Sequence, residues 1–331
     1  NYLDVYRRSG LYPQPMPAGV GQEGAGIVTA VGEGVTHVKA GDRVAYCGGP
    51  DGSYSTARNM PAHTLVKLPK SISFETGAAM MLKGMTVQYL LRRTYKVQRG
   101  QTILFHAAAG GVGLIAMQWA KALGVKVIGT VGSKEKAELA RSYGCDHTIL
   151  YREENIVERV REITKGAMVP VVYDSVGKDT FQGSLDCLRP FGMMVSFGNA
   201  SGPVPAFDLS LLKGSLYITR PSLGAHMVSR SNIEEISADL FKMVASGKVR
   251  IPIEQTYRHG RRRFSWRRRA GRDRQQRETA ALWRAGAAVW CWCARPSGCR
   301  PRLRCGSGGR GVLGLRGAGP KRCGAPHADR S

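Results

Sequence analysis

Gly110 and Gly113 lie in a short turn between an apolar segment at 102–106 and a helical pattern at 112–123. A strand, a tight turn and a helix start in this order direct backbone N–H groups at one point, where the helix dipole also favours an anion. Ala108 stands where the usual G-x-G-x-x-G pattern has its first glycine, so the motif alone is weak. Any glycine-containing turn between a strand and a helix is the alternative explanation. The flanking segments favour a site for the pyrophosphate of a dinucleotide.

Ser133 and Lys134 follow the next apolar segment, about 20 residues after the glycine motif, where an NAD site would place an acidic residue against the ribose 2′-hydroxyl. An acidic side chain would repel a 2′-phosphate, whereas a hydroxyl and an ammonium group can bind one. The pair therefore favours NADPH over NADH. Ser133 also fits the N-cap of a helix that begins at Lys134, and the two roles are compatible.

Alternating helical and β segments position these turns from about residue 81 onward. Repeated βα units of this kind indicate a parallel sheet with helices on both faces. The patterns predict helices near 84–95, 112–123 and 232–246, strands near 102–106, 125–130, 147–150, 170–174 and 193–197, and an extended piece near 249–256.

Residues 1–80 follow a different pattern, rich in Gly, Val and Pro, with short strand-like pieces at 26–32 and 42–46. Short strands with closely spaced turns predict a small barrel-like β domain. The chain opens at Asn1 in the middle of a pattern, so we expect this domain to lack its first segments.

The net charge of +25 is concentrated in residues 258–331. This segment holds 20 Lys+Arg, of which 19 are Arg, and 3 Asp+Glu, which leaves 29 basic and 21 acidic residues in 1–257. It also holds four of the five tryptophans and shows no sustained helical or strand periodicity. Arg runs beside Ala, Gly and Cys are typical of GC-rich codons read out of frame. We therefore hypothesise a disordered or frameshifted tail that begins near residue 258.

A nucleic-acid-binding tail is the competing interpretation, because Arg can hold phosphates and Trp can stack on bases. Charge without a fold pattern is nonspecific, so nucleic acid is not the expected partner. The spacing of Cys291, Cys293, Cys299 and Cys305 matches no firm zinc-finger pattern.

The cysteines and the apolar segments of the sequence indicate the cellular compartment. Cys47, Cys145 and Cys187 are isolated in the body of the chain, which suits a reducing cytosol better than a disulfide scaffold. No apolar run reaches the ~18 residues of a membrane span, and no leader pattern opens the chain. We expect a cytoplasmic protein without membrane attachment.

The glycine turn belongs to a longer motif, which runs from Gly100-Gln101 through Ala108-Ala109-Gly110-Gly111-Val112-Gly113 to Gln118 and Lys121. This motif resembles that of the quinone oxidoreductase and zeta-crystallin group of the medium-chain dehydrogenase/reductase superfamily. Further matching pieces are Lys83-Gly84-Met85-Thr86, Tyr173-Asp174-Ser175-Val176-Gly177, Ser196-Phe197-Gly198-Asn199 and Thr219-Arg220-Pro221-Ser222-Leu223. The resemblance covers residues 1–257 and points to bacterial NADPH:quinone reductases.

The resemblance implies an α/β protein with a Rossmann-type doubly wound parallel sheet and a GroES-like β-barrel catalytic domain. The implied parts are residues 1–82 for the catalytic domain, 83–219 for the Rossmann domain, and 220–257 for a return to the catalytic domain. Residues 258–331 then replace the last part of that domain. The group often forms dimers through the dinucleotide-binding domain, so a homodimer is expected.

The resemblance also implies the roles of individual residues toward NADPH and substrate. The pyrophosphate would meet Gly110, Gly111, Val112 and Gly113, and the 2′-phosphate would meet Ser133, Lys134 and Tyr151. The other implied cofactor contacts are Tyr6, Lys83, Thr86, Ser175, Phe197, Gly198, Asn199, Pro221, Ser222 and Leu223. The substrate cleft would be lined by Asn1, Asp4, Tyr6, Tyr12 and Arg220. Aromatic packing alone is the alternative role of Tyr6 and Tyr12.

Zinc is not expected, although many members of the superfamily are zinc alcohol dehydrogenases. Their G-H-E motif corresponds here to Gly21-Gln22-Glu23, and a neutral amide is a poor zinc ligand. His106, at a strand end, fits packing better than catalysis. Reduction of an unactivated ketone without a Lewis acid is difficult, whereas a quinone is already electron-poor.

Four functions remain open at this point. The first is NADPH-dependent quinone reduction by hydride transfer, in which solvent can supply the proton. The second is reduction of α,β-unsaturated carbonyls. The third is RNA binding, as in crystallin-like relatives, and the fourth is an inactive fragment.

Overall fold

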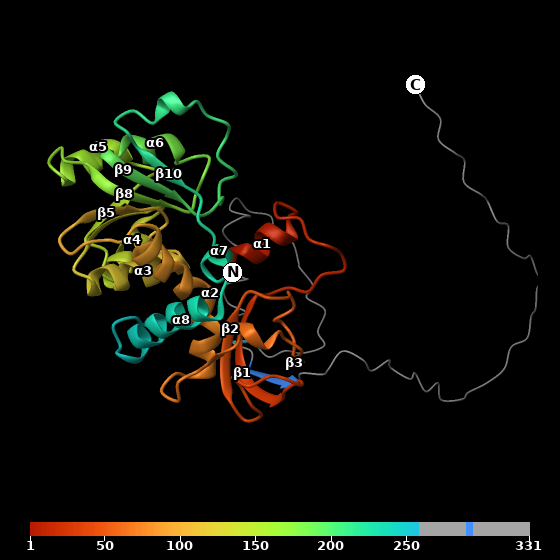
Figure 1. The fold of residues 1–331 in the computed structure, drawn as a ribbon. Coiled ribbons are helices and arrows are strands. Elements are labelled where there is room, and N and C mark those ends of the chain that lie inside the picture. Colours follow the sequence, from red (N-terminus) through yellow and green to blue (C-terminus); the bar gives the residue numbers. More distant parts are fainter. Residues whose placement is uncertain (258–288, 294–331) are drawn as a thin grey trace, which may run out of the picture. The chain divides into compact units, whose positions relative to one another are not determined.

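The computed structural model describes residues 1–257 and 289–293, and these residues hold two β-sheets (Figure 1). One sheet has six parallel strands in the order β10-β9-β8-β5-β6-β7, and the other has five strands in the order β3-β11-β1-β2-β4. No helix in the described ranges combines the length and apolarity that a bilayer crossing requires.

The six-stranded sheet is doubly wound. Its strands are β5 (Thr102–Phe105), β6 (Lys126–Val131), β7 (His147–Leu150), β8 (Val169–Asp174), β9 (Leu188–Ser196) and β10 (Tyr217–Thr219). The chain proceeds outward from β5 through β6 to β7, then returns to the other side of β5 with β8, β9 and β10. The expected Rossmann-type sheet is thereby confirmed, and the strand order reverses beside β5.

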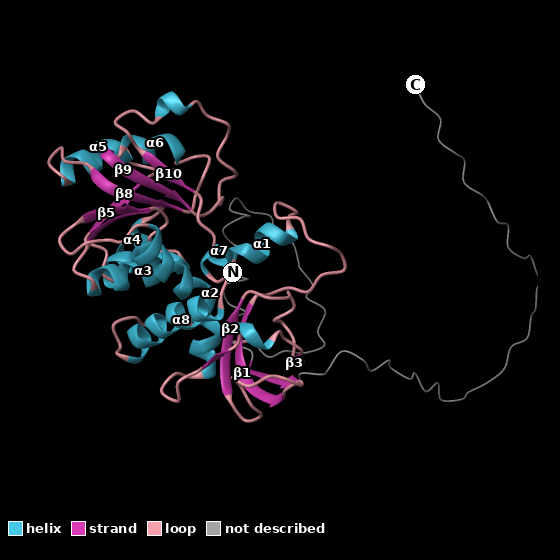
Figure 2. Ribbon diagram, in the orientation of Figure 1, coloured by secondary structure: helices cyan, strands magenta, loops and turns pink. Residues whose placement is uncertain are grey.

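Helices cover both faces of this sheet (Figure 2). One face carries α3 (Gly111–Ala122) and α4 (Lys134–Ser142), and the other carries α5 (Ile156–Ile163) and α6 (Phe181–Asp186). The two faces have separate apolar cores, one around Ile115 and Trp119 and the other around Val160 and Leu185. In β8, Val171 and Tyr173 belong to the first core and Val172 to the second, because successive side chains of a strand point to opposite faces.

The five-stranded sheet is made mainly by the first part of the chain. It contains β1 (Glu23–Ala30), β2 (Arg43–Cys47), β3 (Ala57–Arg58), β4 (Val66–Lys67) and β11 (Val289–Cys293). β1 pairs antiparallel with β2, and β11 runs parallel to β1 and β3. The sequence shows no sustained strand periodicity after residue 257, so β11 was not predicted. Other expectations about residues 258–331 lie outside the described residues.

Two helices differ from the sequence expectation. The helix expected near 84–95 begins earlier, as α2 (Phe74–Tyr89), and continues as the π-helical turn η2 (Leu90–Thr94). Ser73 caps α2 by accepting the N–H of Thr76 at 3.2 Å. The N-terminal region, expected to be a small barrel-like β domain, also contains α1 (Tyr2–Arg8) with a capping box between Asn1 and Asp4.

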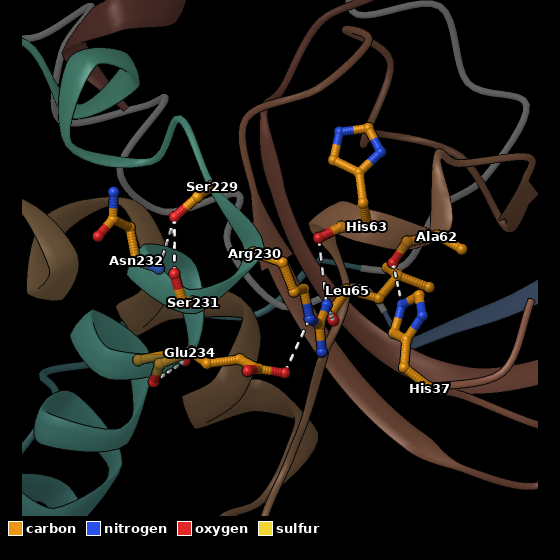
Figure 3. Close-up of polar contacts among 10 residues, drawn as sticks. His37, Ala62, His63, Leu65, Ser229, Arg230, Ser231, Asn232 and Glu234 are labelled. Atoms are coloured by element: carbon orange, nitrogen blue, oxygen red, sulfur yellow. Dashed lines mark hydrogen bonds and ion pairs between the residues drawn. The ribbon is translucent and has the colours of Figure 1, made fainter.

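The return segment holds α7 (Leu223–His226) and α8 (Arg230–Ala245), after the short 3₁₀ helix η3 (Leu209–Leu211). α8 contacts β4 and the 3₁₀ helix η1 (Ala62–Thr64) beside the five-stranded sheet. Arg230 fixes this contact by donating to the carbonyls of His63, at 3.1 Å, and Leu65 (Figure 3). Its Nε donates to Glu234 at 2.8 Å, and Ser229 caps α8. Arg230 therefore joins the return segment to the first sheet.

Candidate active site

The carboxyl ends of all six parallel strands deliver candidate residues to one edge of the sheet. Along the strand order these are Arg220 after β10, Phe197–Asn199 after β9, Ser175 after β8, the glycine turn after β5, Ser133 and Lys134 after β6, and Tyr151 after β7. In open α/β sheets, ligands bind outside this edge, where the strand order reverses. The reversal here lies between β5 and β8, so the glycine turn and Ser175 occupy its centre.

The glycine turn leaves the first amides of α3 open for a ligand. Gly110 is the N-cap, and no side chain caps this helix within the described residues. The first N–H groups of a helix have no intrahelical acceptor, so those of Gly111, Val112 and Gly113 are donors for an anion. Gly113 has no room for a side chain, because a Cβ there would lie 2.4 Å from the Ala108 carbonyl oxygen.

Ser133, Lys134 and Tyr151 come together because β6 and β7 are neighbouring strands. A Cβ on Gly132 would lie 2.7 Å from the Tyr151 hydroxyl, so the tyrosine packs against the turn before Ser133. Ser133 also caps α4, since its Oγ accepts the N–H of Lys136 at 3.4 Å. The guanidinium of Arg152 lies 6.0 Å from the Tyr151 ring centroid. Sequence reasoning missed this arginine, which adds positive charge beside the predicted phosphate contacts.

Arg220 organises the loop after β9. Its Nη1 donates to the carbonyl oxygens of Ser196 and Gly198, both at 3.1 Å, and its Nη2 donates to the Tyr12 hydroxyl at 3.0 Å. Gly198 packs directly on Ser175, where a Cβ would lie 2.4 Å from the serine carbonyl oxygen. The Phe197 ring packs against the Phe105 ring in a tilted arrangement, with ring centroids 5.8 Å apart. The structure therefore groups Ser175, Phe197, Gly198 and Arg220.

Three tyrosines from the N-terminal region reach this loop. The ring centroid of Tyr6 lies 5.0 Å from that of Tyr2 and 5.1 Å from that of Tyr12. The Tyr6 hydroxyl accepts the N–H of Asn199 at 2.8 Å. Burial raises the pKa of Tyr6 to about 12, although the Asn199 N–H lowers it. Tyr6 thus remains neutral near pH 7, and both packing and hydrogen bonding place it against the loop.

Asn1 and Asp4 form hydrogen bonds that hold neighbouring segments of the protein together. Asp4 is buried, and its Oδ1 accepts the N–H of Gly21 at 3.2 Å. The Asn1 side chain donates to Glu23 at 2.7 Å, and the second carboxylate oxygen of Glu23 accepts the N–H of Leu82. Glu23 therefore ties α1 to α2. The role of Asn1 and Asp4 in the wall of a substrate cleft stays a prediction.

Lys83 and Thr86 lie one turn apart on α2. Burial lowers the pKa of Lys83, while the charges of Glu23 and Glu254 oppose that shift. The Thr86 hydroxyl donates to the Leu82 carbonyl at 2.7 Å within the helix. Their predicted cofactor contacts are not tested by these internal interactions.

Pro221, Ser222 and Leu223 lead from Arg220 into α7. The Ser222 Oγ accepts the N–H of Ala225 at 3.3 Å and so caps this short helix. Leu223 packs against the larger apolar core, which fixes the segment after Arg220. Contacts of these three residues with a cofactor remain predictions.

Comparison with known proteins agrees with this geometry. The model of the alcohol dehydrogenase GroES-like domain matches residues 1–70, and the model named zinc-binding dehydrogenase matches residues 111–245. A quinone oxidoreductase of Pseudomonas aeruginosa is 56% identical over 260 residues, which cover 78% of this chain and 80% of that protein. The chain belongs to the quinone oxidoreductase family.

A solved structure of a quinone oxidoreductase has a fold similar to that of this chain. The crystal structure of Escherichia coli quinone oxidoreductase complexed with NADPH has a TM-score of 0.78 and 49% identity, covering 88% of this chain and 87% of that chain. A 2-haloacrylate reductase from Burkholderia sp. is 49% identical over 267 residues, covering 78% of this chain and 80% of that protein. The family therefore includes at least one close relative with a different named substrate.

Zinc does not fit the donors of this family member. Gln22 stands in the position where the zinc-dependent pattern has histidine, and it is buried beside Glu23. Within 1–257 and 289–293, no three His, Cys, Asp or Glu side chains gather closely enough to hold a metal ion. Cys47 instead contacts two thioethers, with Met85 Sδ at 3.6 Å and Met227 Sδ at 3.8 Å.

Proposed function

We propose that this chain catalyses the NADPH-dependent reduction of quinones. The observation that carries the proposal is the set of six strand ends, which bring the open amides of α3, the Ser133–Lys134 pair and the Arg220-held loop to one edge. The 49–56% identity to named quinone oxidoreductases supports the same reaction.

The residues at this edge fit a phosphorylated dinucleotide in three places. Gly111, Val112 and Gly113 offer N–H groups to a pyrophosphate, and the tight approach of Gly113 to Ala108 keeps these amides near the sheet. Lys134 and Ser133 would bind the 2′-phosphate, since no acidic residue follows β6 at that position. When bound, the nicotinamide of NADPH supplies a hydride to the acceptor.

The chain's own groups orient rather than activate the acceptor. Arg220 holds the Phe197–Asn199 loop, so this loop can present a fixed wall to a flat ring. Tyr6 donates no proton readily, because burial raises its pKa to about 12. A quinone needs little polarisation, and its reduced product can take a proton from solvent. The site therefore suits an acceptor that is electron-poor before it binds.

A turnover assay tests this function. The full chain is incubated with NADPH and a simple naphthoquinone, and NADPH absorbance is followed beside a parallel reaction with NADH. We expect NADPH oxidation that depends on both enzyme and quinone and exceeds the NADH rate. Binding of NADPH without oxidation by any of several quinones would contradict quinone reduction.

Reduction of an activated alkene is the second candidate, favoured by the 49% identity to a 2-haloacrylate reductase. Such a substrate also presents an electron-poor carbon and needs no zinc. Supplying 2-chloroacrylate and an enone in the same assay discriminates the two candidates. Alkene turnover far above quinone turnover would select this second function.

We further propose a cytoplasmic homodimer that forms through the parallel sheet. Within the described residues β10 is the terminal strand of this sheet, and edge strands readily pair with another chain. Phe191 on β9 and Tyr217 on β10 are 71% and 56% exposed. Cys47, Cys145 and Cys187 are free thiols, which suits a reducing compartment. Light scattering that gives the monomer mass at micromolar concentration would contradict the dimer.

A further inference from the structure

A buried chain of side chains connects the glycine turn to the loop after β8. It comprises Thr130, His106, Ser184 and Asp174, each at most 1% exposed. His106 Nδ1 lies 3.0 Å from the Thr130 Oγ1, and its Nε2 lies 3.0 Å from the Ser184 Oγ. The Ser184 Oγ lies 2.8 Å from the Asp174 Oδ2. The chain thus crosses the sheet beneath its carboxyl edge.

The donors and acceptors of this chain have one consistent direction. An ionised carboxylate only accepts, so Ser184 donates its O–H to Asp174 and must accept from Nε2–H of His106. Nδ1 of a neutral imidazole then accepts the O–H of Thr130. The Thr130 oxygen in turn accepts the N–H of Ala107 at 3.3 Å. The direction of the chain requires a proton on Nε2 of His106, and with the ring neutral this is the Nε2–H tautomer.

One end of the chain controls the glycine turn. Ala107 has a φ of 55°, a left-handed conformation that residues other than glycine seldom adopt, and Thr130 receives its N–H. The Ala107 carbonyl accepts the N–H of Gly110 at 2.8 Å, which sets the direction of the turn before α3. A shift of Ala107 would therefore move the amides that face the proposed pyrophosphate.

The other end controls the loop after β8. The Asp174 Oδ1 accepts the N–H groups of Val176 and Gly177 at 2.7 and 3.0 Å, and its Oδ2 also accepts the Thr180 hydroxyl at 2.7 Å. Ser175 lies between the carboxylate and these amides, in contact with Gly198. The same buried chain thus sets two loops that flank the reversal of strand order.

We propose that His106, as its neutral Nε2–H tautomer, is a positioning residue that couples the two cofactor loops and prearranges them for NADPH. The inference rests on the proposed NADPH-binding function. It assigns a reason for a histidine at this strand end, which core packing alone does not require. Burial lowers the pKa of His106 and so supports the neutral form, although the Asp174 charge opposes that shift.

Nitrogen NMR of the unliganded full chain tests the tautomer directly. Histidines are labelled with ¹⁵N, and the His106 signals are identified by their loss in His106→Asn. We expect a protonated Nε2 and an unprotonated Nδ1 that stay unchanged from pH 8 to pH 6. An Nδ1–H tautomer, or a cationic ring at pH 7, would overturn the deduced direction of the chain.

Thr130→Val and Thr130→Ser test the coupling to the cofactor. Valine removes the hydroxyl that both His106 and Ala107 use, whereas serine keeps it. We expect Thr130→Val to weaken NADPH binding about tenfold, as measured by fluorescence titration, because two buried polar groups lose their partner. Turnover at saturating NADPH should change less than twofold, and Thr130→Ser should restore binding.

Thr164→Val is the matched control, because the Thr164 hydroxyl also accepts a backbone N–H, from Met168 at 3.1 Å, far from the glycine turn in sequence. It should lower the melting temperature and leave NADPH affinity unchanged. Equal NADPH affinity in wild type, Thr130→Val and Thr164→Val would overturn the coupling. Failure of the wild-type chain itself to bind NADPH would instead refute the proposed function, and the NMR result would still decide the tautomer.

Discussion

Two helices that start at the same sheet edge differ in whether a side chain accepts an N–H group of their first turn. The N-cap of α3 is Gly110, and no side chain caps this helix in the described structure. The N-cap of α4 is Ser133, whose hydroxyl accepts the Lys136 N–H. α5 resembles α4, since Asn155 accepts the N–H groups of Val157 and Glu158. The α3 start therefore keeps its backbone donors for a ligand, while α4 offers side chains beside an already capped helix.

Because of this difference, we expect α3 to determine the affinity for either nicotinamide cofactor and α4 to determine the preference between NADPH and NADH. At α3 the proposed pyrophosphate contact depends on backbone geometry, which only glycine at position 113 permits. At α4 the proposed 2′-phosphate contact depends on the side chains of Ser133 and Lys134. Changes at α3 should abolish binding of either nicotinamide cofactor, and changes at α4 should alter the preference between them.

Gly113→Ala should have the largest effect. The new Cβ would lie 2.4 Å from the Ala108 carbonyl oxygen and 2.5 Å from the Ala107 carbonyl oxygen, so the turn must move. We expect NADPH and NADH binding to weaken by at least about 100-fold, or about 2.7 kcal/mol. Titration calorimetry measures both. Gly183→Ala is the control, because a Cβ at this helical position would have no atom within 4 Å apart from its chain neighbours and the backbone of its own helix. Unchanged affinity in Gly113→Ala would show that the backbone at the start of α3 does not bind the cofactor.

Arg220→Ala should have the next largest effect. The variant removes a charged donor from the Ser196 and Gly198 carbonyls and from the Tyr12 hydroxyl. We expect kcat/KM for quinone reduction to fall about 30-fold, corresponding to about 2 kcal/mol for hydrogen bonds from a charged group. Steady-state kinetics measures the loss, and Arg220→Lys should recover part of it. Equal rates for all three proteins would show that the loop needs no such support.

Lys134→Ala should alter selectivity rather than binding as a whole. Loss of one charge-assisted contact is expected to weaken NADPH about tenfold and leave NADH unchanged. Ser133→Ala should do the same and also destabilise α4 by about 1 kcal/mol through loss of its cap. Asn155→Ala removes a comparable cap from α5 and is the matched control for stability. If Asn155→Ala changes the cofactor preference as much as Ser133→Ala does, the phosphate assignment is wrong.

The parallel sheet and its glycine turn could be predicted from the sequence, because both follow from local patterns of residues. The segment predicted at 147–150 matches β7, and the helix predicted at 112–123 matches α3 within one residue at each end. The start of α2 was missed because ten of its sixteen residues are buried, which removes the amphipathic periodicity of a surface helix. Its Ser73 cap was the available signal.

The buried chain through His106 was beyond sequence reasoning for another reason. His106 is 24 residues from Thr130 and 78 residues from Ser184, so only the folded sheet brings their side chains together. The resemblance implied one cleft for Tyr6 and Arg220, but the hydrogen bond from Asn199 to Tyr6 spans 193 residues and could not be predicted from the sequence. Contacts of this length depend on packing between distant segments rather than on local pattern.

Tyr6→Phe should have the smallest effect. It removes an acceptor of the Asn199 N–H and leaves the ring contacts with Tyr2 and Tyr12 in place. We expect kcat/KM to fall about threefold. The raised pKa of Tyr6, about 12, favours the neutral hydroxyl, so its stabilising effect is present below pH 10 and is lost as pH rises toward 12. The ratio of wild-type to variant rates should therefore be constant from pH 6 to pH 9, as measured in buffered kinetics. A ratio that changes across this range would indicate that Tyr6 exchanges a proton during turnover.

Titration of the full chain with NADPH and NADH, followed by protein fluorescence, tests most directly whether the open α3 start and the Ser133–Lys134 pair together form an NADPH site. We expect saturable binding of both cofactors, with NADPH at least about tenfold tighter, corresponding to one added charge-assisted contact. Equal affinity for the two cofactors, or tighter binding of NADH, would contradict it.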